Sequence, residues 1–141
     1  MLTPRECGIR CRIAFAENYK FQYGSYRFRN SKILFKEEII YSVYSNFHPK
    51  PSQWWYGIPK AEWDDWSNQS LVILMKDGND VNYALLKPNE AIELLKRCKA
   101  VSRDEKKINI RMPTDAGKIY IVEWDQFPIA NRVQPLKVLF N

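Results

Sequence analysis

The residues that decide the fold are LVILMKDGNDVNYALLKPNEAIELLKRCKAVSRDEKKINIRMPTDAGKIYIVEW, positions 71–124 of a 141-residue chain. The first part contains two apolar segments around Asp77-Gly78, a dipeptide typical of tight turns because glycine tolerates positive φ. This pattern predicts a β-hairpin over residues 71–86. The run at 71–75 has no polar interruption, which indicates a strand covered on both faces.

A helix and a second hairpin are expected next. Pro88 is tolerated in a first helical turn, and the apolar residues after it recur at helical spacing, with acidic residues early and basic residues late. We expect this helix over residues 88–99. The alternation at 108–112, the turn residues 114–117 and the apolar segment after them predict an antiparallel hairpin over residues 107–124.

The N-terminal quarter alternates apolar and polar residues, which is typical of half-buried strands. The alternating segments are residues 9–15, 19–23 and 26–29. Thr3 and Glu6 have the spacing of a helix capping box, but Gly8 and the alternation that follows favour strands.

Four more elements complete the expected fold: a helix over 36–44, a strand over 53–58, a short helix opened by Pro59, and an edge strand over 136–140. The sequence therefore predicts a single α+β domain over residues 1–141, with a largely antiparallel sheet and two or three helices. Within it we distinguish basic N-terminal strands (1–36) from a tryptophan-rich βαββαββ core (53–124).

Composition narrows the class of protein. No apolar run approaches the roughly 20 residues that span a bilayer, so we expect no membrane partner. Three cysteines, an odd number, argue against a disulfide framework and favour a reducing, cytoplasmic setting. The net charge is +6, and residues 1–36 hold eight basic and two acidic residues, whereas the remainder holds 14 of each sign. Such asymmetry points to an anionic partner.

The predicted N-terminal strands would collect positive charge on one face, because alternate side chains share a face of a strand. The cations concerned are Arg10, Arg12, Lys20, Arg27 and Arg29. An ordinary solvated face over a core has the same pattern. Trp54 and Trp55 are adjacent in a predicted strand, so at least one of them should point away from the core.

These residues suggest a non-enzymatic module that binds DNA or RNA. Cations would neutralise phosphates, and Trp54 or Trp55 would stack on an unpaired base. Dense tryptophans also fill cores and interfaces, so a protein-interaction subunit or inhibitor that docks through its tryptophan-rich patch is an alternative. No RNP, zinc-finger or basic-zipper motif occurs, and the chain resembles no family that we identify.

A small magnesium-dependent nuclease of the restriction type is a second alternative. Its acidic residues would be Asp77 or Asp80 and the Glu105-Lys106-Lys107 segment. Solvated turns explain these residues equally well, so we assign no catalytic residue, no metal ligand and no cofactor. We interpret the cysteines as buried structural thiols. His48, the one histidine, lies in a proline-flanked loop without a catalytic motif.

Overall fold

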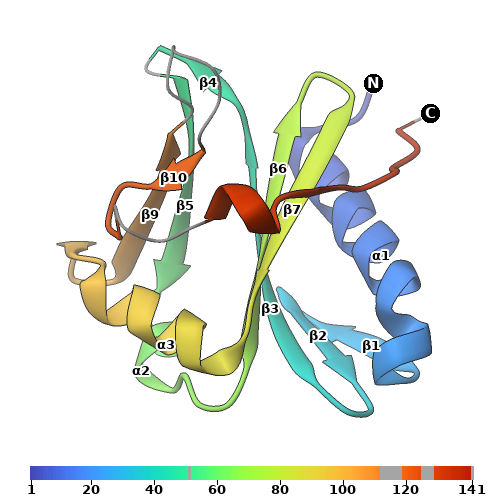
Figure 1. The fold of residues 1–141 in the computed structure, drawn as a ribbon, viewed down its shortest axis with the longest axis horizontal. Helices are drawn as coiled ribbons and strands as arrows, with labels where there is room; N and C mark the ends of the chain where they lie inside the picture. Colours follow the sequence, from blue (N-terminus) through green and yellow to red (C-terminus); the bar gives the residue numbers. More distant parts are fainter. Residues whose placement is uncertain (51, 112–118, 125–128, 141) are drawn as a thin grey trace.

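Two β-sheets and three α-helices form the part of the chain that the computed structural model describes, residues 1–50, 52–111, 119–124 and 129–140 (Figure 1). The helices are α1 (Pro4–Tyr23), α2 (Lys60–Asp64) and α3 (Pro88–Arg97), and a 3-10 turn η1 covers Ile129–Arg132. The first sheet has the order β1 (Tyr26–Arg29), β2 (Lys32–Phe35), β3 (Ile39–Asn46), β6 (Ser70–Asp77), β7 (Asp80–Leu86) and β11 (Gln134–Pro135). The second has the order β10 (Tyr120–Ile121), β9 (Glu105–Arg111), β5 (Ser52–Pro59) and β4 (His48–Pro49), and β8 (Ala100–Ser102) pairs with β9.

Strands β3 and β6 are parallel, and the other paired strands are antiparallel. The prediction of a single α+β domain with largely antiparallel pairing is confirmed. Within the described residues, no helix is both long enough and apolar enough to cross a membrane.

The hairpin predicted over 71–86 is β6 and β7, which turn at Gly78 with a φ of 62°. Residues 71–75 are buried on both faces, as their unbroken apolar pattern predicted. Leu71, Ile73 and Met75 face one core, and Val72 and Leu74 face another. The parity of a strand produces this division, since alternate side chains point to opposite faces.

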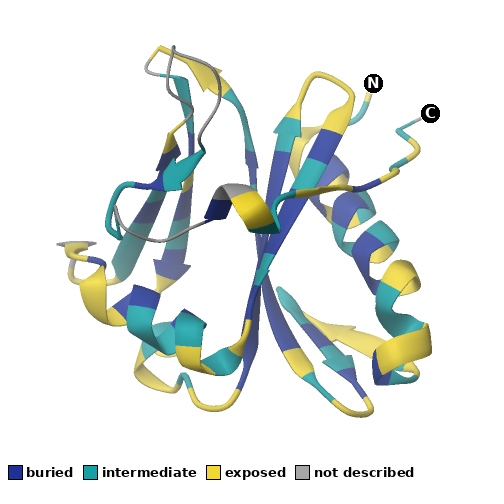
Figure 2. Cartoon of the chain, in the orientation of Figure 1, coloured by how far each residue is buried: buried dark blue, intermediate teal, exposed yellow. Residues whose placement is uncertain are grey.

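The two cores lie on opposite sides of the central strands (Figure 1, Figure 2). The larger core is covered by the second sheet and α3, whose Ala91, Leu94 and Leu95 are buried. The smaller core is covered by α1 through Cys11, Phe15 and neighbouring apolar residues. The molecule is thus layered, with the central strands sandwiched between two separate coverings.

The predicted helix at 88–99 is α3, which begins at Pro88 and ends at Arg97. The carboxylate of Glu90 accepts a hydrogen bond of 3.0 Å from the Lys87 N–H, which closes the N-terminal turn. In the second predicted hairpin, Arg111 of β9 pairs with Tyr120 of β10. The turn predicted at 114–117 lies outside the described residues.

The predicted N-terminal strands are wrong for residues 9–23, which belong to α1. The capping box is formed at the start of this helix: the Glu6 N–H donates to the Thr3 hydroxyl and the Thr3 N–H donates to the Glu6 carboxylate. The buried residues of α1 include Cys7, Cys11 and Phe15, a spacing of four, whereas the alternating Ile9 and Ile13 are exposed. Only the segment at 26–29 forms a strand, β1.

Two other expectations need correction. The helix predicted over 36–44 is instead strand β3, whose β-branched residues are paired with β2 on one side and β6 on the other. The edge strand predicted over 136–140 is not formed there: the last strand is β11, which covers only Gln134–Pro135. The strand at 53–58 and the helix after Pro59 are confirmed as β5 and α2.

Replacement of Leu74 by alanine tests the double burial of β6. Leu74 has no exposed surface, so Leu74→Ala should lower the free energy of unfolding by about 2–5 kcal/mol in urea denaturation. The matched control is Leu139→Ala, since Leu139 is 74% exposed and should change stability by less than about 0.5 kcal/mol. Equal effects of the two substitutions would contradict a two-sided core around β6.

Candidate functional site

The five predicted cations do not share a surface. Successive residues of a helix are about 100° apart, so Arg10 and Arg12 point in clearly different directions from α1. The Arg10 Nη1 donates to the main-chain oxygen of Leu139 at 3.0 Å, whereas the Arg12 Nε donates to Ser42 Oγ at 2.7 Å. The prediction of a common basic strand surface is therefore wrong.

The other three predicted cations are also separated. Lys20, further along α1, forms an ion pair with Glu17 at 2.9 Å. Arg27 and Arg29 are exposed on β1. Their cross-strand partners, Leu34 and Lys32, alternate with residues that are buried under α1. Arg27 and Arg29 thus lie on the sheet face that points away from α1.

The tryptophans divide between the core and one exposed position. Trp54 is 3% exposed, and its Nε1 donates to the Lys76 main-chain oxygen at 3.0 Å. Trp63 and Trp66 are partly buried and pack against the larger core. Trp55 is 41% exposed. The prediction that at least one of the adjacent pair points away from the core is confirmed, and the residue that does so is Trp55.

Trp55 lies on the outer face of the second sheet among polar side chains. Cross-strand pairing places Gln53 opposite Arg111, and Trp55 opposite Asn109. Lys107 reaches over the indole, with its Nζ at 4.6 Å from a ring centroid. We call this surface the Trp55 face and define it by seven side chains, of which Glu105 is the acidic one: His48, Gln53, Trp55, Glu105, Lys107, Asn109 and Arg111.

Two features of the Trp55 face favour an anionic, planar ligand. Among the described residues neither Lys107 nor Arg111 has a carboxylate partner. The nearby Glu123 carboxylate accepts hydrogen bonds from the Asn109 main-chain N–H at 2.6 Å and from its Nδ2 at 2.8 Å, and forms no ion pair with either cation. The His48 ring lies 6.0 Å from the indole and only 24° from parallel to it.

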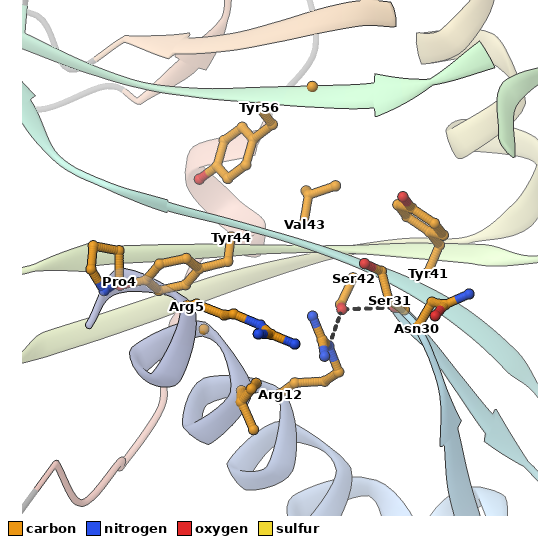
Figure 3. A pocket seen from close by; sticks show the side chains of 13 residues that line it. Pro4, Arg5, Arg12, Asn30, Ser31, Tyr41, Ser42, Val43, Tyr44 and Tyr56 are labelled. Atoms are coloured by element: carbon orange, nitrogen blue, oxygen red, sulfur yellow. Dashed lines mark hydrogen bonds between the residues drawn. The ribbon is translucent and has the colours of Figure 1, made fainter. Parts of the chain in front are cut away.

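A second polar region is a pocket of about 420 Å³ between the N-terminal half of α1, the β1–β2 turn, β3 and β5 (Figure 3). Arg5 and Arg12 both reach into it. We call it the arginine pocket. Arg12 is half-buried, and burial lowers the pKa of its guanidinium group, which stays charged at neutral pH.

The acidic residues of the suggested nuclease site belong to different sheets. Asp77 and Asp80 face each other at the β6–β7 turn, whereas Glu105 begins β9 in the other sheet. Across residues 1–50, 52–111, 119–124 and 129–140, no three metal-ligating side chains come together. Cys11 and Cys98 are buried, and burial raises the pKa of each thiol to about 12.

Comparisons of the chain with protein-family models, with curated proteins and with solved structures found no match.

Sequence reasoning missed three cations of these surfaces, namely Arg5, Lys107 and Arg111, as well as the polar residues beside Trp55. Lys107, Asn109 and Arg111 alternate in the sequence with two isoleucines that are buried in the structure. This alternation predicts a strand with one polar face. Arg5 and Arg12 are seven residues apart, which is about two helical turns, so they lie on the same side of a helix. In a strand the same odd separation would place them on opposite faces. Interpreting this segment as a strand therefore hid their relationship.

Acrylamide quenching of tryptophan fluorescence tests the assignment of Trp55 as the exposed indole. Trp55→Phe should remove the most readily quenched component, because the other four indoles pack in or against the core, namely those of Trp54, Trp63, Trp66 and Trp124. Trp54→Phe is the matched control and should leave that component in place. An unchanged quenching constant in Trp55→Phe would show that another tryptophan is the accessible one.

Proposed function

We propose that this chain is a non-enzymatic module that binds single-stranded nucleic acid, DNA or RNA, on the Trp55 face. The observation that carries the proposal is an exposed indole on an outer sheet face beside two cations, neither of which has a carboxylate partner in the part of the chain that the structure describes. The combination of an exposed indole with neighbouring cations provides both a stacking surface for a base and groups that bind phosphate, which is the arrangement that single-strand-binding proteins use.

The ring chemistry favours an unpaired base as the ligand. Stacking of a base on an aromatic side chain contributes about 1–3 kcal/mol and tolerates any base, because every base has a π-face. Duplex bases are already stacked on each other, so a single strand offers the accessible ring. His48 adds a second ring beside the indole, at an orientation close to parallel.

The charges support contacts to the phosphate backbone. Lys107 covers the indole through a cation–π contact, and its flexible stem lets the ammonium group move to a phosphate when a base takes its place. Arg111 lies across from Gln53 on the same face and provides a second cation. Two phosphate contacts on a single strand give a salt slope of about −1.4, so the binding should be only moderately salt-sensitive.

The three cysteines support the expected setting. Cys7, Cys11 and Cys98 are all free thiols, which fits a reducing compartment such as the cytoplasm.

Fluorescence anisotropy with labelled oligothymidylate and oligouridylate tests this proposal. Trp55→Ala should weaken binding about 5- to 150-fold, the equivalent of one lost stacking contact. Lys107→Ala combined with Arg111→Ala should bring the salt slope close to zero, because both phosphate contacts are removed.

Arg27→Ala combined with Arg29→Ala is the control with the same loss of charge. These arginines are exposed on the first sheet, outside the Trp55 face, and their removal should leave the affinity within about twofold. If they weaken binding as much as the Lys107 and Arg111 substitutions do, the Trp55 face is not the site. Absence of binding at low salt would overturn the function itself.

A further inference from the structure

The arginine pocket lies where β3 extends past the end of its neighbour. Strand β2 begins at Lys32, which pairs with Tyr41, so the β3 edge from Ser42 to Tyr44 continues beyond it. The first turns of α1 approach this edge closely: a Cβ at Gly8 would lie 3.2 Å from the Tyr44 ring. The pocket opens between this helix and β5 (Figure 3).

Two arginines of α1 converge on this space. Arg5 and Arg12 are separated by seven residues, or about two helical turns, so their side chains leave the same side of α1. Figure 3 shows their guanidinium groups directed toward the same part of the pocket. Two like charges that converge in a partly dehydrated site repel each other, and an anion between them would offset that cost.

Arg12 is held in a defined orientation. Its Nε donates to Ser42 Oγ at 2.7 Å, and the Ser42 hydroxyl donates in turn to the Ser31 main-chain oxygen at 2.8 Å (Figure 3). This relay uses the Nε and leaves the terminal nitrogens of the guanidinium for another acceptor. Within the described part of the chain, neither Arg5 nor Arg12 has a carboxylate partner.

Carboxylates from neighbouring elements are placed elsewhere. Glu62 of α2 forms an ion pair with Lys32 at 3.5 Å. Glu105 lies against Gly57 at the position that a Cβ would take, on the face of β5 opposite Tyr56. Glu6 closes the capping box at Thr3. Among the residues that the structure describes, neither the half-buried, oriented guanidinium group of Arg12 nor the exposed one of Arg5 therefore has a counter-ion, and an external anion can contact both.

We propose that the arginine pocket binds a phosphomonoester group. A phosphomonoester carries a charge between about −1.5 and −2 near neutral pH, which matches two guanidinium groups, whereas a carboxylate carries only one charge. Guanidinium forks suit the oxygens of phosphate in bidentate contacts. A volume of about 420 Å³ accommodates a small phosphorylated molecule. The same group occurs at the 5′ end of a nucleic-acid strand.

Calorimetric titration with phenyl phosphate and with inorganic phosphate tests the site, and benzoate is the monoanionic control with the same ring. Phenyl phosphate should bind more tightly than benzoate, and its affinity should fall as the pH drops below about 6, where the phosphate becomes a monoanion. Arg5→Ala and Arg12→Met should each weaken the binding about 10- to 100-fold. Arg27→Ala, outside the pocket, should leave it unchanged.

Arg5→Ala is the decisive variant because Arg5 is exposed and forms no hydrogen bond or ion pair within the described residues. Wild-type affinity in Arg5→Ala and Arg12→Met, or equal binding of benzoate, would overturn the proposal. Oligothymidylates with and without a 5′-phosphate, measured in the Trp55→Ala background, distinguish the source of the group. A response to the 5′-phosphate alone assigns it to a strand end, and a response to phenyl phosphate assigns it to a small molecule. Retained phosphate binding in Trp55→Ala separates this site from the Trp55 face.

Discussion

The structure depends on the burial of strand β6 on both of its faces. Its five central residues are apolar without interruption, so either face left open would expose large side chains to water. One covering is α1, and the other is the second sheet together with α3. Because these coverings come from segments far apart in the chain, the same requirement positions both the N-terminal arginines and the tryptophan-rich strand (Figure 1).

The covering by α1 determines where its charges go. Cys11 and Phe15 face the core, so Arg5 and Arg12 project to one side of the helix, toward the open end of β3. The close approach of Gly8 to Tyr44 places the helix against this edge, since a larger residue at that position would push it away. The arginine pocket is therefore a consequence of how the helix packs, and the basic excess of residues 1–36 is divided among several directions.

Features encoded by local sequence were the ones that could be predicted. The Asp-Gly turn before β7 and Pro88 at the start of α3 are short-range signals that tertiary packing did not override. The segment at 9–23 carried two conflicting local signals, a capping box and an apolar alternation. Which of them prevails depends on the surface available for packing, and the paired face of β3 and β6 accepts a helix. The pairing of β3 with β6 likewise involves a partner distant in sequence. Without knowledge of that partner, the apolar residues of β3 fitted a helix as well as a strand.

The outward position of Trp55 follows from the two residues beside it. Trp54 and Tyr56 bury their rings in the larger core, and each donates a hydrogen bond of 3.0 Å to a carbonyl of β6, at Lys76 and Leu74 respectively. Each such bond contributes about 0.5–1.5 kcal/mol, and loss of either would leave a buried polar group unsatisfied. The alternation of β5 then requires Trp55 to face outward. The sequence predicted that one of the two tryptophans would do so, but the choice between them depends on carbonyl acceptors about 20 residues further along the chain. The same alternation separates the two candidate sites, because Tyr56 lines the arginine pocket whereas Trp55 lies on the opposite face of β5.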